Sequence, residues 1–135
     1  MPKMTEPTTY ATDPDLVVGR YLAVWSEPDP ASRRAAIAGL WAGDGCEFVE
    51  GPRFQGHEQL CDRITAAYQE FVGSGRYTVS AASDVTRHDD IVTLTIQLTT
   101  PRGEIAWAAR VFLLLDAGDL IKEDYQLTVK PLEQA

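Results

Sequence analysis

The chain has 135 residues, 44% of them hydrophobic, and a formal net charge of −8 at pH 7. This length and composition predict one globular domain, and the acidic surface argues against nucleic acids and anionic membranes as partners. The longest nearly apolar run, Ile105 to Leu115, is too short for a transmembrane helix, and the first residues lack the apolar segment of a signal peptide. With only two cysteines, Cys46 and Cys61, we expect a cytoplasmic protein without a disulfide framework.

The first half of the chain predicts helices. A capping residue followed by proline marks a helix start at Thr12 or Asp13, and another at Asp29. We expect the second of these helices to stop at Gly43. A short strand, "CEFVE", and a loop, "GPRFQG", then precede a third helix.

The third helix, from about His57 to Val72, has the clearest helical spacing of apolar residues in the chain. After "GSG" this spacing changes to two, which is typical of strands. Four strands are expected, over about residues 76–86, 91–100, 104–115 and 120–129. In the second of them apolar residues alternate with threonine and glutamine, so one face of the sheet is expected to be buried and the other polar.

This order of elements predicts an α+β domain over residues 13–130. Three N-terminal helices would pack on one face of a strongly curved antiparallel or mixed sheet, and the two layers would enclose an apolar pocket. Residues 1–12 are polar and without periodicity, so we expect them to form a flexible segment before the domain.

Several short stretches occur in an order that resembles one known superfamily. They are "RYLAVWSEPDP", "LWAGDGCEFVEGP", "GHEQL" and "DLIKEDYQL". From Asp13 to Val129 the chain thereby resembles the nuclear transport factor 2-like proteins, which include ketosteroid isomerases, SnoaL-type polyketide cyclases and limonene epoxide hydrolases. The resemblance implies a cone-shaped α+β barrel around a deep pocket, usually assembled as a homodimer. It does not fix the activity, because one fold carries many functions.

The catalytic residues of these relatives are only partly present. The resemblance places Tyr21 where ketosteroid isomerases have a tyrosine that donates a hydrogen bond to the substrate oxyanion. Their base falls on Gly51 or Val49 and their second acid on Val111, and none of these can transfer a proton. We therefore expect no steroid isomerase activity by that mechanism. The catalytic aspartate of SnoaL-type cyclases falls on Gln126, and the arginine and two aspartates of limonene epoxide hydrolases are not recognisable as a set.

The stretch "IKEDYQ" in the last expected strand poses a question of register. Simple alternation from Ile121 turns Glu123 and Tyr125 toward the core. The resemblance instead turns Asp124 and Gln126 inward, and a β-bulge would reconcile the two. We favour an inward Asp124, whose pKa would be raised by an apolar pocket into the range of a general acid or base. The alternative is a structural Asp124 that pairs with an arginine or a tyrosine hydroxyl.

These considerations define a predicted site. Asp124 and Tyr21 are the candidate catalytic residues, and Glu47 is a second candidate acid. The pocket is expected to be lined by Trp25, Trp41, Glu47, Val92, Leu94, Trp107, Ala109, Val111 and Gln126. His57 and His88 lack a third ligand, so we expect no metal site, and we expect no cofactor because no phosphate-binding or nucleophile motif occurs.

Three functions compete at this stage. The first is a cofactor-independent isomerase, cyclase or hydrolase that acts on a small hydrophobic molecule bearing a carbonyl or epoxide. The second is a non-catalytic protein that binds a hydrophobic small molecule, and the third is a dimeric accessory protein. We expect a homodimer joined through the polar face of the sheet, with Thr93, Thr95 and Gln97 near its centre.

Overall fold

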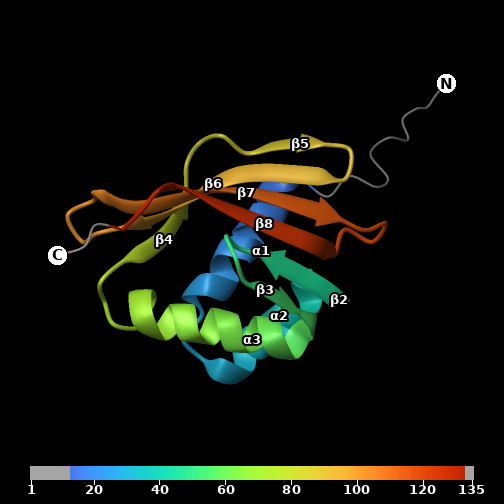
Figure 1. The fold of residues 1–135 in the computed structure, drawn as a ribbon, viewed down its shortest axis with the longest axis horizontal. Helices are drawn as coiled ribbons and strands as arrows, with labels where there is room; N and C mark the ends of the chain where they lie inside the picture. Colours follow the sequence, from blue (N-terminus) through green and yellow to red (C-terminus); the bar gives the residue numbers. More distant parts are fainter. Residues whose placement is uncertain (1–12, 133–135) are drawn as a thin grey trace.

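The computed structural model describes residues 13–132, so the expected flexible segment at residues 1–12 lies outside the described residues. The elements follow one another as α1 (Pro14–Ser26), α2 (Pro30–Leu40), β2 (Trp41–Phe48), β3 (Arg53–Gln55), α3 (Gly56–Ala67), η2 (Tyr68–Val72), β4 (Thr78–Ala81), β5 (Thr86–His88), β6 (Ile91–Thr99), β7 (Ile105–Leu115) and β8 (Ile121–Lys130). The short helix η2 is a π-helix that directly continues α3. The predicted α+β class is therefore confirmed (Figure 1).

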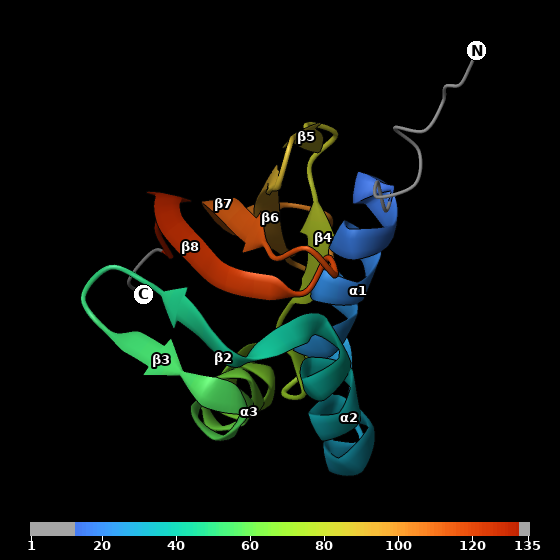
Figure 2. The ribbon, with the colours of Figure 1, turned by 90° about the vertical axis from the view of Figure 1, so that its right-hand side faces the viewer.

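The strands form one seven-stranded mixed sheet with the order β3-β2-β8-β7-β6-β4, and β5 pairs with β6 beside this path. Strands β2 and β8 are parallel, and the other pairs are antiparallel. The sheet is strongly curved (Figure 2), but it is not closed, because its end strands β3 and β4 are not paired with each other. The barrel implied by the resemblance is thus an open one.

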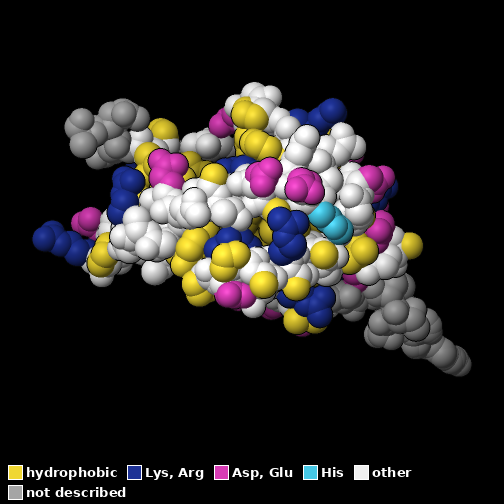
Figure 3. All heavy atoms as spheres, turned by 90° about the horizontal axis from the view of Figure 1, so that it is seen from below, with side chains coloured by type: hydrophobic (Ala, Val, Ile, Leu, Met, Phe, Trp, Pro, Cys, Tyr) yellow, Lys and Arg dark blue, Asp and Glu magenta, His cyan; other side chains and the backbone are white. Residues whose placement is uncertain are grey.

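The helices cover the concave side of this sheet, with α3 lying across it and α1 beside β4 (Figures 1 and 2). Between the two layers lies a core of buried side chains that includes Tyr21, Ile37, Trp41, Ile64 and Leu94. The outward surface of the helices carries acidic, basic and apolar side chains interspersed (Figure 3). No helix within residues 13–132 is both long and apolar enough to cross a membrane.

The second helix ends earlier than predicted. It stops at Leu40, and Trp41 already begins β2, so Gly43 lies inside the strand instead of ending the helix. The cause is tertiary, because the fully buried Trp41 pairs with Ile121 of β8. A side chain at Gly45 would place its Cβ 2.8 Å from the Ile121 carbonyl oxygen, so this close strand contact requires glycine.

The first of the four predicted strands is interrupted. Strands β4 and β5 are separated by residues 82–85. The interruption is held by Asp84, whose carboxylate accepts hydrogen bonds from the Thr95 backbone N–H at 3.1 Å and from the Thr95 hydroxyl at 2.6 Å. Arg110 donates to the same carboxylate at 2.7 Å. These polar contacts belong to the outer face of the sheet.

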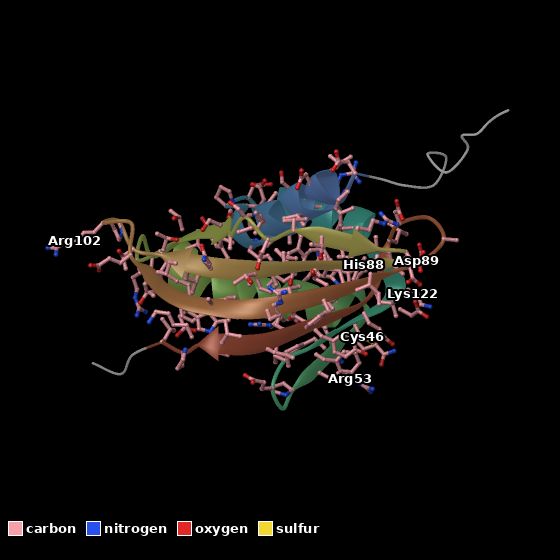
Figure 4. The ribbon with its side chains drawn as sticks, turned by 90° about the horizontal axis from the view of Figure 1, so that it is seen from above. Cys46, Arg53, His88, Asp89, Arg102 and Lys122 are labelled. Carbon is pink, nitrogen blue, oxygen red and sulfur yellow. The ribbon has the colours of Figure 1, made fainter. Side chains whose placement is uncertain are left out.

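Figure 4 looks onto that outer face. Arg102 marks the turn between β6 and β7 at one end of the sheet, and His88 and Asp89 mark the turn between β5 and β6 at the other end. Thr93, Thr95 and Gln97 of β6 are half-buried on this face, since the alternate residues of the strand face the core.

Arg33 of α2 connects the first two helices to the third. It is 3% exposed, and its guanidinium donates to the Glu27 carbonyl at 2.8 and 3.0 Å and to the Thr65 hydroxyl at 3.1 Å. The same group lies 4.7 Å above the centre of the Tyr68 ring. A planar guanidinium makes these contacts at once, whereas an ammonium does not.

We predict that Arg33→Lys destabilises the protein by roughly 1–3 kcal/mol, because at least two hydrogen bonds to buried acceptors are lost. Urea denaturation followed by circular dichroism measures the change. The matched control is Arg34→Lys, at the neighbouring exposed position, which we expect to change the free energy of unfolding by less than about 0.5 kcal/mol. Equal effects of the two substitutions would contradict this role of Arg33.

Candidate functional site

A bulge in β8 decides which acid of "IKEDYQ" faces the core. Ile121 pairs with Leu115 and Glu123 with Leu114, so Lys122 is the extra residue between two consecutive partners. Ile121 and Asp124 are both fully buried although they are three residues apart. Glu123 therefore lies on the outer face, where it accepts a hydrogen bond from the Tyr125 hydroxyl at 2.6 Å.

Asp124 forms a buried hydrogen-bonded chain with α1 and with its own strand. The Tyr21 hydroxyl donates to Oδ2 of Asp124 at 2.7 Å, and Nε2 of Gln126 donates to the Tyr21 hydroxyl oxygen at 2.7 Å. Tyr21 is held between the rings of Trp25 and Trp41, whose centres lie 6.0 and 5.9 Å away. Since these side chains are at most 6% exposed, the chain is shielded from bulk water.

A second acid lies beside the first. Glu47 of β2 is the parallel-strand partner of Asp124, and both side chains are fully buried. The Arg63 side chain on α3 donates from Nε to Oε1 of Glu47 at 2.9 Å. The remaining oxygens, Oε2 of Glu47 and Oδ1 of Asp124, have no hydrogen-bond partner among the described residues. Two carboxyl groups thus lie side by side in the core, and each has one oxygen without a hydrogen-bond partner among the described residues.

The surroundings shift the proton affinities of these groups. Burial, followed by the negative charge of Glu47, raises the pKa of Asp124 well above its usual value. Burial also raises the pKa of Glu47, although the neighbouring Arg63 opposes the shift. The pKa of Tyr21 is raised well above its ordinary value by burial and then by the two acids. The environment of the cluster therefore favours the protonated, uncharged forms of these side chains over their ionised forms.

An apolar pocket of about 160 Å³ lies next to this cluster, between the end of α3 and the inner face of the sheet. Its walls come from α1, α3, η2 and four strands, and it is lined by Trp25, Arg63, Ala67, Phe71, Val72, Val79, Ile96, Leu98, Trp107, Gln126 and Leu132. Arg63 and Gln126 belong to both the pocket and the polar cluster. They are the contacts through which a bound molecule would reach the buried acids.

The structure distributes the predicted site residues over three places. Trp25, Trp107 and Gln126 line the pocket. Tyr21, Asp124 and Glu47 lie behind it, in the polar cluster. Five residues that we expected on the pocket wall are packed instead in the core, where the helices contact the sheet directly: Trp41, Val92, Leu94, Ala109 and Val111.

Sequence reasoning missed Arg63 and the aromatic wall from η2. Arg63 is four residues before Ala67, so both lie on one side of α3 beside the apolar stripe of Leu60 and Ile64. This spacing is visible in the sequence, but a charged residue beside an apolar stripe ordinarily points to solvent, so Arg63 was not predicted to be a site residue. Phe71 belongs to the apolar stripe of the predicted third helix, but it reaches the pocket from a π-helical turn that no sequence pattern predicted.

No group of three or more histidine, cysteine, aspartate or glutamate side chains within residues 13–132 is arranged to hold a metal ion. His57 instead places Nε2 2.9 Å from the Trp41 carbonyl oxygen, and His88 is exposed at the end of β5. The two cysteines are both free and buried.

The amino-acid sequence matches no protein-family model and no curated protein sequence. Solved structures nevertheless share its fold. A proposed isomerase of the SnoaL-like family from Agrobacterium tumefaciens superposes with a TM-score of 0.75 at 22% identity, over 84% of this chain and 94% of that one. A protein with a ketosteroid isomerase-like fold from Catenulispora acidiphila, solved with trimethylamine, gives 0.62 at 19% identity, over 82% of each chain.

A nuclear transport factor 2-like protein of unknown function from Exiguobacterium gives a TM-score of 0.63 at 11% identity, over 85% of this chain and 99% of that one. Identities this low establish the fold alone, because the fold carries many activities. The chain adopts the nuclear transport factor 2-like fold that SnoaL-like and ketosteroid isomerase-like proteins share.

Proposed function

We propose that the protein is a cofactor-independent acid–base enzyme that acts on a small apolar molecule carrying a carbonyl or epoxide oxygen. The observation that carries the proposal is the buried acid pair, Glu47 and Asp124, directly behind an apolar pocket. Two adjacent buried acids oppose folding, so they do not benefit a protein whose function needs only an apolar cavity. Acids with raised pKa values are, by contrast, what proton transfer near neutral pH requires.

In the proposed reaction a proton moves along the hydrogen-bonded chain from Asp124 through Tyr21 to the ligand. The ligand oxygen is held by Arg63 and Gln126 at the pocket surface. For an epoxide, water attacks a ring carbon and the C–O bond breaks; the Gln126 side chain turns aside, and the Tyr21 hydroxyl transfers its proton to the ring oxygen. Asp124 returns a proton to the Tyr21 oxygen, and the proton released by the attacking water restores the acid pair beside Arg63. Such proton transfer contributes rate factors of about 10²–10⁴.

A second candidate function is non-catalytic binding of a small apolar molecule. It is favoured by one observation: Tyr21 and Asp124 do not line the pocket, and Gln126 lies between them and a bound ligand. In this case the acids would only orient Gln126 and Arg63. The two candidates share the pocket and differ in the need for an ionisable Asp124.

We also propose that the chain forms a homodimer through the outer face of the sheet. Apart from the threonines of β6, this face bears two exposed apolar side chains on β8, Leu127 and Val129, which are 47% and 62% exposed. Exposed apolar residues on a half-polar sheet are suited to pairing with a second copy.

Analytical ultracentrifugation at micromolar concentration should therefore show a dimer, and Leu127→Lys should shift the equilibrium toward monomer, because it places a charge in the contact. The control is Lys122→Ala, an exposed position at the other end of β8. A parent chain that sediments as a monomer would exclude this assembly.

Small aromatic ketones should raise the melting temperature of the protein. A ligand that binds only the folded state adds about 2.7 kcal/mol of stability at one hundred times its Kd. Ala67→Phe should abolish the shift, because Ala67 lines the pocket and a phenyl group would fill it. The matched control, Ala66→Phe on the exposed side of the same helix, should keep the shift, and an unchanged shift in Ala67→Phe would place the ligand elsewhere.

Asp124→Asn should lower a proton-transfer activity of the protein by about 10²–10⁴ while keeping the fold. Its effect on stability depends on pH. The raised pKa of Asp124 means that the folded parent binds more protons than the unfolded chain, so its free energy of unfolding falls as pH rises from about 4 toward that raised pKa. The Asn variant has no ionisable group at position 124, so its free energy of unfolding does not show this decrease.

Between pH 4 and 8 the melting temperature of the Asn variant should consequently rise relative to that of the parent. Above neutral pH the variant should be at least as stable as the parent. Asp62→Asn, at an exposed position of α3, is the control. If Asp124→Asn is clearly less stable than the parent at pH 7–8, Asp124 is a structural residue and the binding function is the better one.

A further inference from the structure

The directions of the hydrogen bonds in the polar cluster restrict where a proton can be. Gln126 donates to the Tyr21 oxygen, so the single hydroxyl hydrogen of Tyr21 points to Oδ2 of Asp124, which must accept. Arg63 can only donate, so Oε1 of Glu47 must also accept. A proton bound to either acid therefore lies on Oδ1 of Asp124 or Oε2 of Glu47. These are the two buried oxygens that lack a partner among the described residues.

Three protonation states of the pair can be compared. With no proton, two adjacent carboxylates share a fully buried position, and only the Arg63 charge and the Tyr21 hydrogen bond to Asp124 oppose their repulsion among the described residues. With two protons, the Arg63 guanidinium loses the negative charge that it faces. With one proton between Oδ1 and Oε2, both remaining oxygens are hydrogen-bonded and one negative charge faces one guanidinium. The one-proton state is therefore the state that leaves no polar group of the pair unsatisfied.

This state fixes the charge that a ligand meets. The single negative charge of the acid pair and the positive charge of Arg63 cancel, so the base of the pocket has no net charge before a ligand enters. A cationic ligand would face the guanidinium, and an anionic ligand would add a net negative charge next to the buried acids. Only Nε of Arg63 is used by Glu47, and its two terminal nitrogens have no hydrogen-bond partner within residues 13–132. The buried indole N–H of Trp25, also a pocket residue, likewise lacks an acceptor there. The Arg63 guanidinium also lies 5.2 Å from the centre of the Trp25 ring and 5.5 Å from that of the Phe54 ring.

The size of the pocket limits the apolar part of the ligand. A volume of about 160 Å³ is close to that of a dry engineered cavity of about 150 Å³ that takes up benzene. A single six-membered ring with a short substituent fills this space, whereas most of a steroid would lie outside it. The unused hydrogen-bond donors at the base require an acceptor on that ligand.

We propose that Glu47 and Asp124 share a single proton, and that the neutral site they form with Arg63 selects an uncharged, benzene-sized ligand with an oxygen acceptor. The ligand class rests on the proposed function in that it takes this pocket as the binding site. The shared proton does not depend on a ligand.

Infrared spectroscopy at pH 7 tests the shared proton. The parent should show one protonated-carboxyl band, and Glu47→Gln and Asp124→Asn should each remove it, because the introduced amide donates to the remaining acid in place of the proton. Asp62→Asn, the exposed control, should leave the band unchanged. Absence of the band in the parent would mean that both acids are ionised. Its persistence in both single variants would mean that both are protonated, and either result overturns the one-proton state.

Calorimetric titration and melting curves with four ligands of similar shape test the ligand class: acetophenone, benzoate, benzylamine and ethylbenzene. Acetophenone should bind best, with benzoate and benzylamine at least about tenfold weaker, a difference of about 1.4 kcal/mol. Ethylbenzene should be weaker than acetophenone in the parent, and Arg63→Met should remove that difference. Arg34→Met, on the exposed surface of α2, should preserve it.

The outcomes separate the two proposals. Preference for benzoate or benzylamine over acetophenone would overturn the neutral site while leaving the pocket as a binding site. Equal binding of acetophenone and ethylbenzene would overturn the role of Arg63. If none of the four ligands binds, both the ligand class and the proposed function fail, whereas the infrared result stands by itself.

Discussion

The bulge at Lys122 is the constraint on which the rest of the site depends. It allows Ile121 and Asp124 to face the core together, although three residues separate them. A regular strand that kept Ile121 inward would bury Glu123 and send Asp124 to the outer face. Because β8 is also the parallel partner of β2, the bulge brings Asp124 to the position opposite Glu47. A single extra residue thus creates a buried pair of acids.

The polar cluster connects two helices with two strands of the sheet. Tyr21 comes from α1, Glu47 from β2, Arg63 from α3, and Asp124 and Gln126 from β8. Each buried polar group is costly by itself, and the cost falls only when the others are in place. The cluster therefore constrains how the helices sit on the sheet. Its position behind the pocket links this structural requirement to chemistry, since a ligand at Arg63 or Gln126 touches the network directly.

The fold alone leaves the activity open, and the side chains of this chain set it apart from the enzymes that it resembles. Val111 stands where ketosteroid isomerases carry their second acid, and it is a core residue. The acids present here lie on β2 and β8, and both are shielded from the pocket by Gln126 and Arg63. A proton transfer in this protein would accordingly combine Tyr21, which the resemblance shares with ketosteroid isomerases, with acids at other positions of the fold.

The sequence by itself determined the helices and most of the strands in their order, because helix caps such as Asp29 and the alternation in Ile91–Thr99 act over a few residues. It also indicated Tyr21 and Asp124 through the resemblance, and a bulge as the way to turn Asp124 inward. Tertiary structure decided what depends on distant partners. The stretch "GPRFQG", expected as a loop, instead contains strand β3, Arg53–Gln55, which forms by pairing with β2. Trp41 became a strand residue by pairing with Ile121. The sequence also indicated Glu47 as a second acid, but its ion pair with Arg63 forms because β2 and α3 pack against each other. No local pattern encodes such a meeting of segments far apart in the chain.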